Sequence, residues 1–211
     1  MVITERDKMI IKEVSRWRVM LGRQLKILGG FTGTRATDIR LKKLIDNCYL
    51  ERKKYIYGIA GIYKITPLSK RLFNLDSYIN KVRIEQLEHD IAVVDTYLYF
   101  KEKLGIISSD VKSEKELRSE QGFTTRGHVP DFVINHQGKK YAVEVELTLK
   151  SKERFHKNVK DNYINYDRQI WIVEKEELRI IKLLEYFQSS YNNIEIIFLE
   201  SLKNLKEEQS V

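Results

Sequence analysis

Three carboxylates lie inside one stretch of alternating residues, HVPDFVINHQGKKYAVEVELTLK, at positions 128–150. Asp131 follows Pro130, and Glu144 and Glu146 come after a gap of 12 residues. Residues two apart in a strand share a face, and a turn at 136–138 brings Asp131 near Glu144 or Glu146. Clustered carboxylates repel one another and are costly to bury without a partner. The stretch therefore predicts a metal site in which Asp131, Glu144 and Glu146 bind Mg²⁺ or Mn²⁺ through oxygen atoms.

A second interpretation of the same stretch stays open. Antiparallel strands often alternate apolar residues toward the core with polar residues toward water, and Glu144 and Glu146 fit that pattern. The hairpin would then be solvent-facing and carry no site.

The elements around this hairpin suggest a mixed α/β arrangement from about residue 80 onward. A long helix over 82–104 carries Leu87, Ile91, Val94 and Leu98 on one stripe. The patterns that follow predict strands at 110–117, 129–134 and 140–149, a helix at 152–163, a strand at 169–173, a helix at 175–189 and a strand at 194–199.

The N-terminal part predicts a different order of elements. Helices are expected at 5–20, with Thr4 as N-cap, at 23–28 before Gly29-Gly30, and at 35–47. Strands at 49–57 and 62–66 flank a turn at 58–61, and a helix starts at Thr66-Pro67. The buried side of the third helix is assigned to Ile39, Leu41, Leu44 and Ile45. Cys48 is expected to be a small buried hydrophobic residue.

Charge separates the two parts. Residues 1–80 hold 17 Lys and Arg against 7 Asp and Glu, a net charge of +10, whereas residues 81–211 carry a net charge of −2. A basic N-terminal part is typical of nucleic-acid binding. No segment is long and apolar enough for a membrane span, and MVITERDKMI is not a signal peptide. The single cysteine, Cys48, suits a reducing compartment, so a cytoplasmic protein without a membrane partner is expected.

The N-terminal order of elements is that of a winged helix-turn-helix. RLKKLIDNCYLER resembles the stretch in winged-helix regulators where the recognition helix runs into the wing, and IYKITPLSKRLF resembles the second wing strand and its helix. The N-terminal residues of such a helix contact bases, and wing residues contact phosphates. The expected DNA contacts are Thr34, Arg35, Thr37, Asp38, Arg40, Lys43, Arg52, Lys53 and Lys54. The alternative is that these side chains only solvate a helix face.

The second part resembles the PD-(D/E)XK nuclease superfamily, on Pro130-Asp131, on Glu144-Val145-Glu146 and on the order of strands and helices. The fold class expected from both resemblances is α+β or α/β: a winged helix-turn-helix over 1–78, then a restriction-endonuclease-like domain over 79–211. The resemblance implies a metal that polarises the scissile phosphate, helped by a lysine. Glu146 occupies the lysine position, and Lys150 is the residue that could reach back to replace it.

The whole chain resembles the replication-relaxation family, which includes MobC-type relaxases of mobilisable plasmids. The resemblance implies a sequence-specific DNA-binding protein of a plasmid or mobile element, a metal-dependent nickase acting at an origin of transfer or replication. It implies Asp131, Glu144 and Glu146 as ligands, adds His89 as a catalytic candidate, and allows Glu85, Glu116 and Glu120 as further carboxylates. Its implied partners are double-stranded DNA, a second copy of the chain, and other mobilisation or replication proteins.

The alternative function is a non-catalytic transcriptional or replication regulator with a degenerate nuclease fold, which the missing lysine favours. Several residues are left between two roles. His128 is either a turn residue or a phosphate or metal contact, and Tyr163 and Tyr166 follow the basic run without a feature that marks a nucleophile. That run, which either solvates a helix or contacts phosphates, comprises Lys150, Lys152, Arg154, Lys157 and Lys160.

Overall fold

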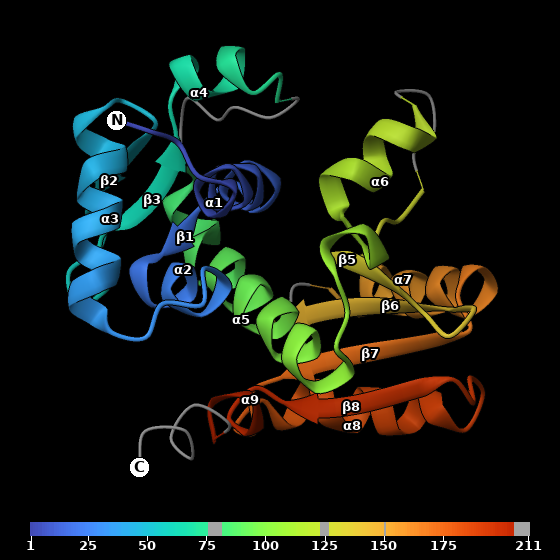
Figure 1. Ribbon diagram of the computed structural model, residues 1–211. Coiled ribbons are helices and arrows are strands. Elements are labelled where there is room, and N and C mark those ends of the chain that lie inside the picture. The colour runs from blue at the N-terminus through green and yellow to red at the C-terminus, as the bar shows by residue number, and fades with distance from the viewer. Residues whose placement is uncertain (76–81, 123–126, 150, 205–211) are drawn as a thin grey trace. The chain divides into compact units, whose positions relative to one another are not determined.

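A computed structural model describes residues 1–75, 82–122, 127–149 and 151–204. The chain is a mixed α+β protein with two open sheets, and it divides into two compact units, Met1–Leu98 and Tyr99–Val211 (Figure 1). The division falls inside helix α5 (Leu87–Leu104), whereas the sequence suggested a boundary at residue 78. None of the helices in the described ranges combines the length and hydropathy needed to cross a bilayer.

The first unit begins with three helices and a small sheet, followed by α4 and then by the start of α5. The elements are α1 (Glu5–Trp17), β1 (Met20–Leu21), α2 (Gly22–Leu28), α3 (Thr34–Asp46), β2 (Leu50–Lys53), β3 (Ile62–Ile65) and α4 (Pro67–Leu72). The strands form an antiparallel sheet in the order β1-β3-β2. Strand β1 was not predicted, because two residues are too short to show a period.

The predicted helix starts of the first unit are confirmed where a side chain caps them. The Thr4 hydroxyl accepts from the Asp7 amide, and Asp7 accepts in return from the Thr4 amide at 2.7 Å, which forms a capping box. The Thr66 hydroxyl accepts from the Ser69 amide and caps α4, with Pro67 in the first turn. These caps satisfy amides that have no partner within the helix.

Two expectations for α3 and its C-terminus are wrong. Ile39 is 50% exposed, and Thr37 is buried with Leu41 and Leu44. Cys48 is exposed and adopts a positive φ of 58°. Its amide donates to the Ile45 carbonyl at 2.8 Å and the next amide donates to Leu44 at 2.8 Å, the pattern of a Schellman motif. Cys48 therefore stands where glycine is preferred.

Replacing Cys48 by Gly is expected to stabilise the first unit. A left-handed conformation costs a residue with a Cβ about 1 kcal/mol, and glycine adopts it freely. Urea unfolding of Cys48→Gly should show a free energy of unfolding about 1 kcal/mol above that of the wild type. Cys48→Ala removes the same sulfur but keeps the Cβ, so equal stabilities of the Gly and Ala variants would contradict the explanation.

The second unit is built around a five-stranded sheet. After the end of α5 come β4 (Val111–Ser113), α6 (Glu114–Gln121), β5 (Phe132–His136), β6 (Lys139–Glu146), α7 (Lys152–Asn165), β7 (Arg168–Val173), α8 (Leu178–Gln188), β8 (Ile194–Phe198) and α9 (Ser201–Asn204). The order β4-β5-β6-β7-β8 combines an antiparallel meander with two parallel pairs. The strand predicted at 110–117 is wrong beyond Ser113, because the Ser113 hydroxyl caps α6.

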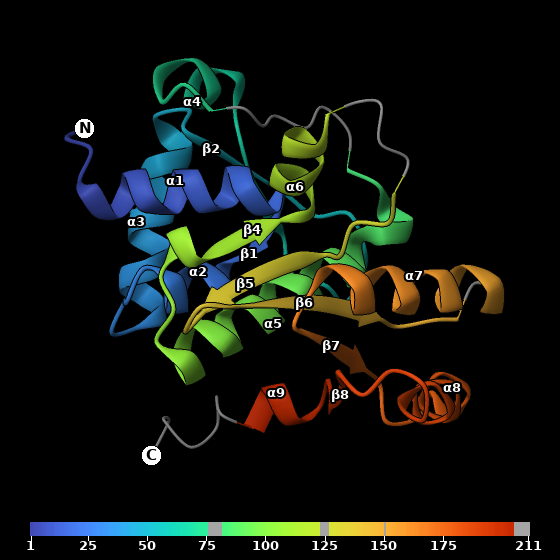
Figure 2. The same cartoon turned by 90° about the vertical axis from the view of Figure 1, so that its right-hand side faces the viewer.

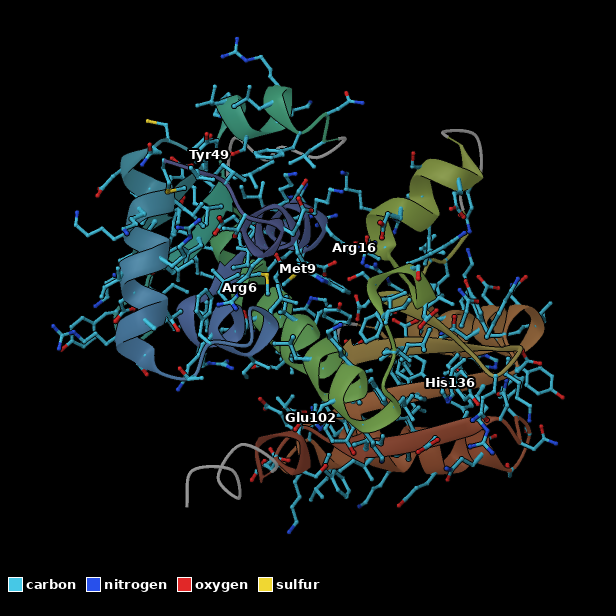
Figure 3. The ribbon with its side chains drawn as sticks, in the orientation of Figure 1. Arg6, Met9, Arg16, Tyr49, Glu102 and His136 are labelled. Atoms are coloured by element: carbon cyan, nitrogen blue, oxygen red, sulfur yellow. The ribbon has the colours of Figure 1, made fainter. Side chains whose placement is uncertain are left out.

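The hairpin that carries the carboxylates is confirmed, with a tighter turn than expected. His136 ends β5 (Figure 3), and only Gln137 and Gly138, with φ of 51° and 75°, make the turn. Two positive φ values in a two-residue loop match the twist of the flanking strands. The pairing of Phe132 with Val143 fixes the register, so Asp131 comes opposite Glu144.

One face of this sheet is covered by α7 and α8 (Figure 2). Phe155 and Val159 of α7 pack with Trp171 and Val173 of β7 in a core that α8 completes. Glu144 pairs in register with Trp171, so the two side chains point to the same face. Glu144 therefore points toward α7 and is only 7% exposed. The alternative interpretation, in which Glu144 faces solvent, is wrong.

Candidate functional site

The site centres on the buried carboxylate of Glu144. His128 Nε2 and Asn162 Nδ2 both contact its Oε1 atom, the latter at 2.7 Å. His128 lies in the segment before β5, and Asn162 projects from α7 toward β6. A helix packed over the strand thus supplies a donor to a carboxylate that would otherwise be buried without one.

Asp131 lies beside Glu144 at the start of β5. Its Oδ2 accepts from the Val145 amide at 2.8 Å, which fixes the carboxylate against the neighbouring strand. The negative charge of Asp131 acts on both Glu144 and His128. The sequence prediction that a hairpin would place Asp131 near Glu144 is therefore confirmed.

The pKa values of the two contacting groups are both raised. Burial raises the pKa of Glu144, and the hydrogen bonds from His128 and Asn162 oppose this only in part. Burial alone would lower the pKa of His128, but the hydrogen bond to Glu144 and the nearby negative charges outweigh it. The pair therefore keeps a proton to a higher pH than the ordinary pKa values of the two groups would give.

Two oxygen atoms of this cluster have no donor within the described part of the chain. The hydrogen bonds of Glu144 converge on Oε1 and leave Oε2 without one. The Oδ1 atom of Asn162, a residue only 1% exposed, is buried without a hydrogen-bond partner. Carboxylate and amide oxygens are the ligands that Mg²⁺ and Mn²⁺ prefer, so the donor set fits such an ion.

The third predicted ligand does not join the pair. Among the residues that the structure describes, no group of three or more His, Cys, Asp and Glu side chains is arranged to hold a metal ion. Glu146 ends β6 and is half-buried. The structure therefore gathers Asp131 and Glu144 but not the predicted trio, and Lys150 lies outside the described residues.

The remaining acidic and histidine candidates lie elsewhere. His89 and Glu85 belong to the first unit, in α5 and in the short helix η1 (Ile84–Gln86) before it. Glu116 accepts from the Ser113 amide and caps α6, and Glu120 pairs with Lys112 at 2.7 Å. Glu116 was predicted on a strand and instead caps a helix, and Glu120 links α6 to β4.

Helix α7 carries the predicted basic run and one of the two tyrosine candidates. Its Lys152, Arg154, Lys157 and Lys160 are exposed. Tyr163 packs against Tyr191, with ring centroids 5.1 Å apart. Tyr166, just after the helix, has a pKa raised by burial and then by the charge of Glu144, which places its phenol in the field of the site.

The DNA contacts predicted on α3 divide into exposed and engaged residues. Thr34, Arg35, Asp38 and Lys43 are exposed. Thr37 is buried and its hydroxyl donates to the Gly33 carbonyl at 3.0 Å. Because Thr37 is inside the fold, its assignment as a base contact is wrong.

Arg40 is engaged in a structural ion pair. Its guanidinium binds both carboxylate oxygens of Asp7, with Nε 2.7 Å from Oδ1, and Asp7 is fully buried. Burial by itself would raise the pKa of Asp7, but the hydrogen bonds from Arg40 and Thr4 lower it below its ordinary value of 3.8. Arg40 therefore stabilises α1 against α3, and its assignment as a DNA contact is withdrawn.

Replacing Arg40 by Ala is expected to destabilise the first unit by about 3 kcal/mol, because the buried Asp7 carboxylate loses its partner. Since the folded-state pKa of Asp7 is lowered, the contribution is present at neutral pH and is lost only as the pH falls below 3.8. Urea unfolding at pH 7 and pH 3 measures it. Lys43→Ala, an exposed change on the same helix, should alter stability by less than about 0.5 kcal/mol.

The three basic residues predicted on the first hairpin are all exposed. Arg52 lies 5.6 Å from the ring centroid of Tyr63, and Lys53 and Lys54 lie over Tyr55 and Tyr57. Each of the three cations thus makes a cation–π contact with a tyrosine ring in or near the same hairpin. We use "α3–hairpin surface" for the exposed residues Thr34, Arg35, Asp38, Lys43, Arg52, Lys53 and Lys54.

Sequence reasoning identified Asp131 and Glu144 but missed Asn162 and left His128 undecided. His128 precedes Asp131 by three residues, so the hairpin register already places it near the end of β6. Asn162 gives no such signal, because its role depends on how α7 crosses the sheet. A scan against protein-family models and a search of curated proteins both find no match to this sequence.

Proposed function

We propose that the chain binds double-stranded DNA through its first unit and cleaves a phosphodiester bond with a divalent cation held in its second unit. The observation that carries the proposal is a pair of carboxylates on adjacent strands, the buried Glu144 and beside it the half-buried Asp131, which the Val145 amide fixes. Two carboxylates together with substrate phosphates are a usual coordination for Mg²⁺.

The DNA-binding half of the proposal rests on topology and charge. The order α1-β1-α2-α3-β2-β3, with α2 and α3 joined through Gly29-Gly30, supports a winged helix-turn-helix. Residues 1–80 carry a net charge of +10. Helix α3 would read bases through Arg35 and its neighbours, and the cations of the α3–hairpin surface would contact phosphates.

The nuclease-like half rests on the strand order. Helix α5, the antiparallel meander β4-β5-β6, helix α7 and the parallel strand β7 follow the order of the PD-(D/E)XK core. A bound Mg²⁺ or Mn²⁺ would polarise the scissile phosphate and activate water. Asp131 and Glu144 would hold it, and His128 and Asn162 orient Glu144 through Oε1. The exposed cations of α7 would contact the backbone of the DNA.

The test is a cleavage assay on supercoiled plasmid that carries the origin region of the element encoding the protein. Mg²⁺ or Mn²⁺ is expected to produce open circles, a chelator should abolish them, and Asp131→Asn should bind the DNA without cutting it. Tight, sequence-selective binding without cleavage under either metal would reject the nuclease and leave a DNA-binding regulator.

That regulator is the second candidate, and one observation favours it. Glu146 stands where the superfamily motif has lysine. In that case the cluster would be a structural ion pair in a scaffold that grips DNA without cutting it.

Lys53→Ala and Lys54→Ala are each expected to weaken DNA binding uniformly across sequences. Each lost phosphate contact lowers the slope of log K against log salt concentration by about 1. Fluorescence anisotropy over a series of salt concentrations would measure the slope. Lys139→Ala removes an equally exposed charge from the second unit's hairpin, and an equal loss of slope there would show that the effect is not specific to the α3–hairpin surface.

A further inference from the structure

The amide of Asn162 is fixed in one orientation. Its Nδ2 group donates to Glu144 Oε1 at 2.7 Å, an atom that His128 Nε2 also contacts. The other end of the amide, Oδ1, is then presented inside the protein, where the described residues offer it no donor. A buried acceptor without a donor is costly, and native proteins rarely leave one unfilled.

We propose that Asn162 is a third ligand of the cation and supplies Oδ1 beside the carboxylates of Asp131 and Glu144. The inference rests on the metal site of the proposed function and adds a residue that the sequence motif does not contain. Oδ1 of Asn162 is buried without a donor, and it belongs to a side chain that already contacts Glu144 through Nδ2. A cation held by Asp131 and Glu144 would satisfy this oxygen as well, without a further donor.

This assignment gives α7 a role in completing the site. Asp131 and Glu144 come from adjacent strands of one hairpin, and Asn162 comes from the helix that covers them. Phe155 and Val159, on the buried side of α7, pack against β7 and hold the helix in place. Ligands from a sheet and from a helix packed on it are rigidly positioned, as metal binding requires.

The test measures Mn²⁺ affinity of the full chain by isothermal titration calorimetry, without DNA. Asn162→Leu is expected to weaken binding by about 10- to 100-fold, the loss typical when a group that supports a metal is removed. Asn158→Leu makes the same change one turn earlier on α7 and should leave the affinity within about twofold of the wild type. Thermal melting in chelator shows that each variant is folded.

Asn162→Asp separates a ligand from a residue that only orients Glu144. It keeps an oxygen atom for the cation but loses the Nδ2 donor. If Oδ1 is a ligand, this variant retains Mn²⁺ binding. If it binds as weakly as Asn162→Leu, the residue acts only through Glu144 and the inference is overturned.

The outcomes also separate this inference from the proposed function. Wild-type protein that binds no Mn²⁺ would reject the metal site as a whole. Binding that Asp131→Asn abolishes and Asn162→Leu leaves intact would keep the metal site and reject only Asn162, whose Oδ1 would then accept from a buried water. A crystal soaked in Mg²⁺ should place Oδ1 about 2.1 Å from the ion.

Discussion

Glu144→Gln is expected to reduce metal-dependent DNA cleavage by about 10³-fold, whereas Glu146→Gln, the same change two residues along the same strand, should reduce it by less than about tenfold. A metal that stabilises transition-state charge contributes several kcal/mol, and loss of about 4 kcal/mol corresponds to that first factor. Glu144 lies beside Asp131 and carries an oxygen without a donor, whereas Glu146 lies outside that pair.

The comparison is controlled because both variants keep the shape of the side chain. In Glu144→Gln the new amide still offers an oxygen to His128 and Asn162, so the fold should survive. The measurement is the initial rate of open-circle formation at saturating Mg²⁺, with DNA affinity and melting temperature determined for each variant. Equal losses in the two variants would restore the three-carboxylate site predicted from sequence, and no loss in either would place the chemistry elsewhere.

Many helices and strands could be predicted from the sequence because local sequence features determine where they begin and end. Thr4 and Thr66 cap helices, Gly138 closes a hairpin, and alternation marks the two strands on either side of it. Local patterns failed where two structures compete for one segment. The segment SEKELRSE gives a weak strand signal at its start. The Ser113–Glu116 capping box instead begins a helix that contains the rest of it.

The part of the candidate site that depends only on the hairpin register could be predicted from the sequence. Register alone brings Asp131 opposite Glu144, and that pairing needs only the turn and a period of two. Burial of Glu144 and its contact with Asn162 depend on how α7 packs on the sheet, which periodicity does not specify. The same limit explains Arg40, whose partner Asp7 lies 33 residues away on another helix.

His128→Ala is expected to destabilise the second unit by about 3 kcal/mol, because it leaves the Glu144 carboxylate buried with Asn162 as its one remaining donor among the described residues. Urea unfolding at pH 7 measures the change. His136→Ala removes a histidine that ends β5 beside the turn, and its effect should stay within about 0.5 kcal/mol. Equal effects of the two substitutions would show that the contact with Glu144 contributes no particular stability.

The pH dependence of the wild type gives an independent check on the same pair. The folded-state pKa of His128 is raised above 6.5, so its contribution is fully present below pH 6.5 and is lost as the pH rises through the raised value. The free energy of unfolding should therefore fall above pH 6.5, by at most about 1.4 kcal/mol per pH unit for one proton. A His128→Leu, Glu144→Leu double variant lacks both groups, so its free energy of unfolding should not show this pH dependence. The double variant should also be more stable than His128→Ala, because an apolar pair buries no charge. A slope that persists in the double variant would assign the proton to another residue.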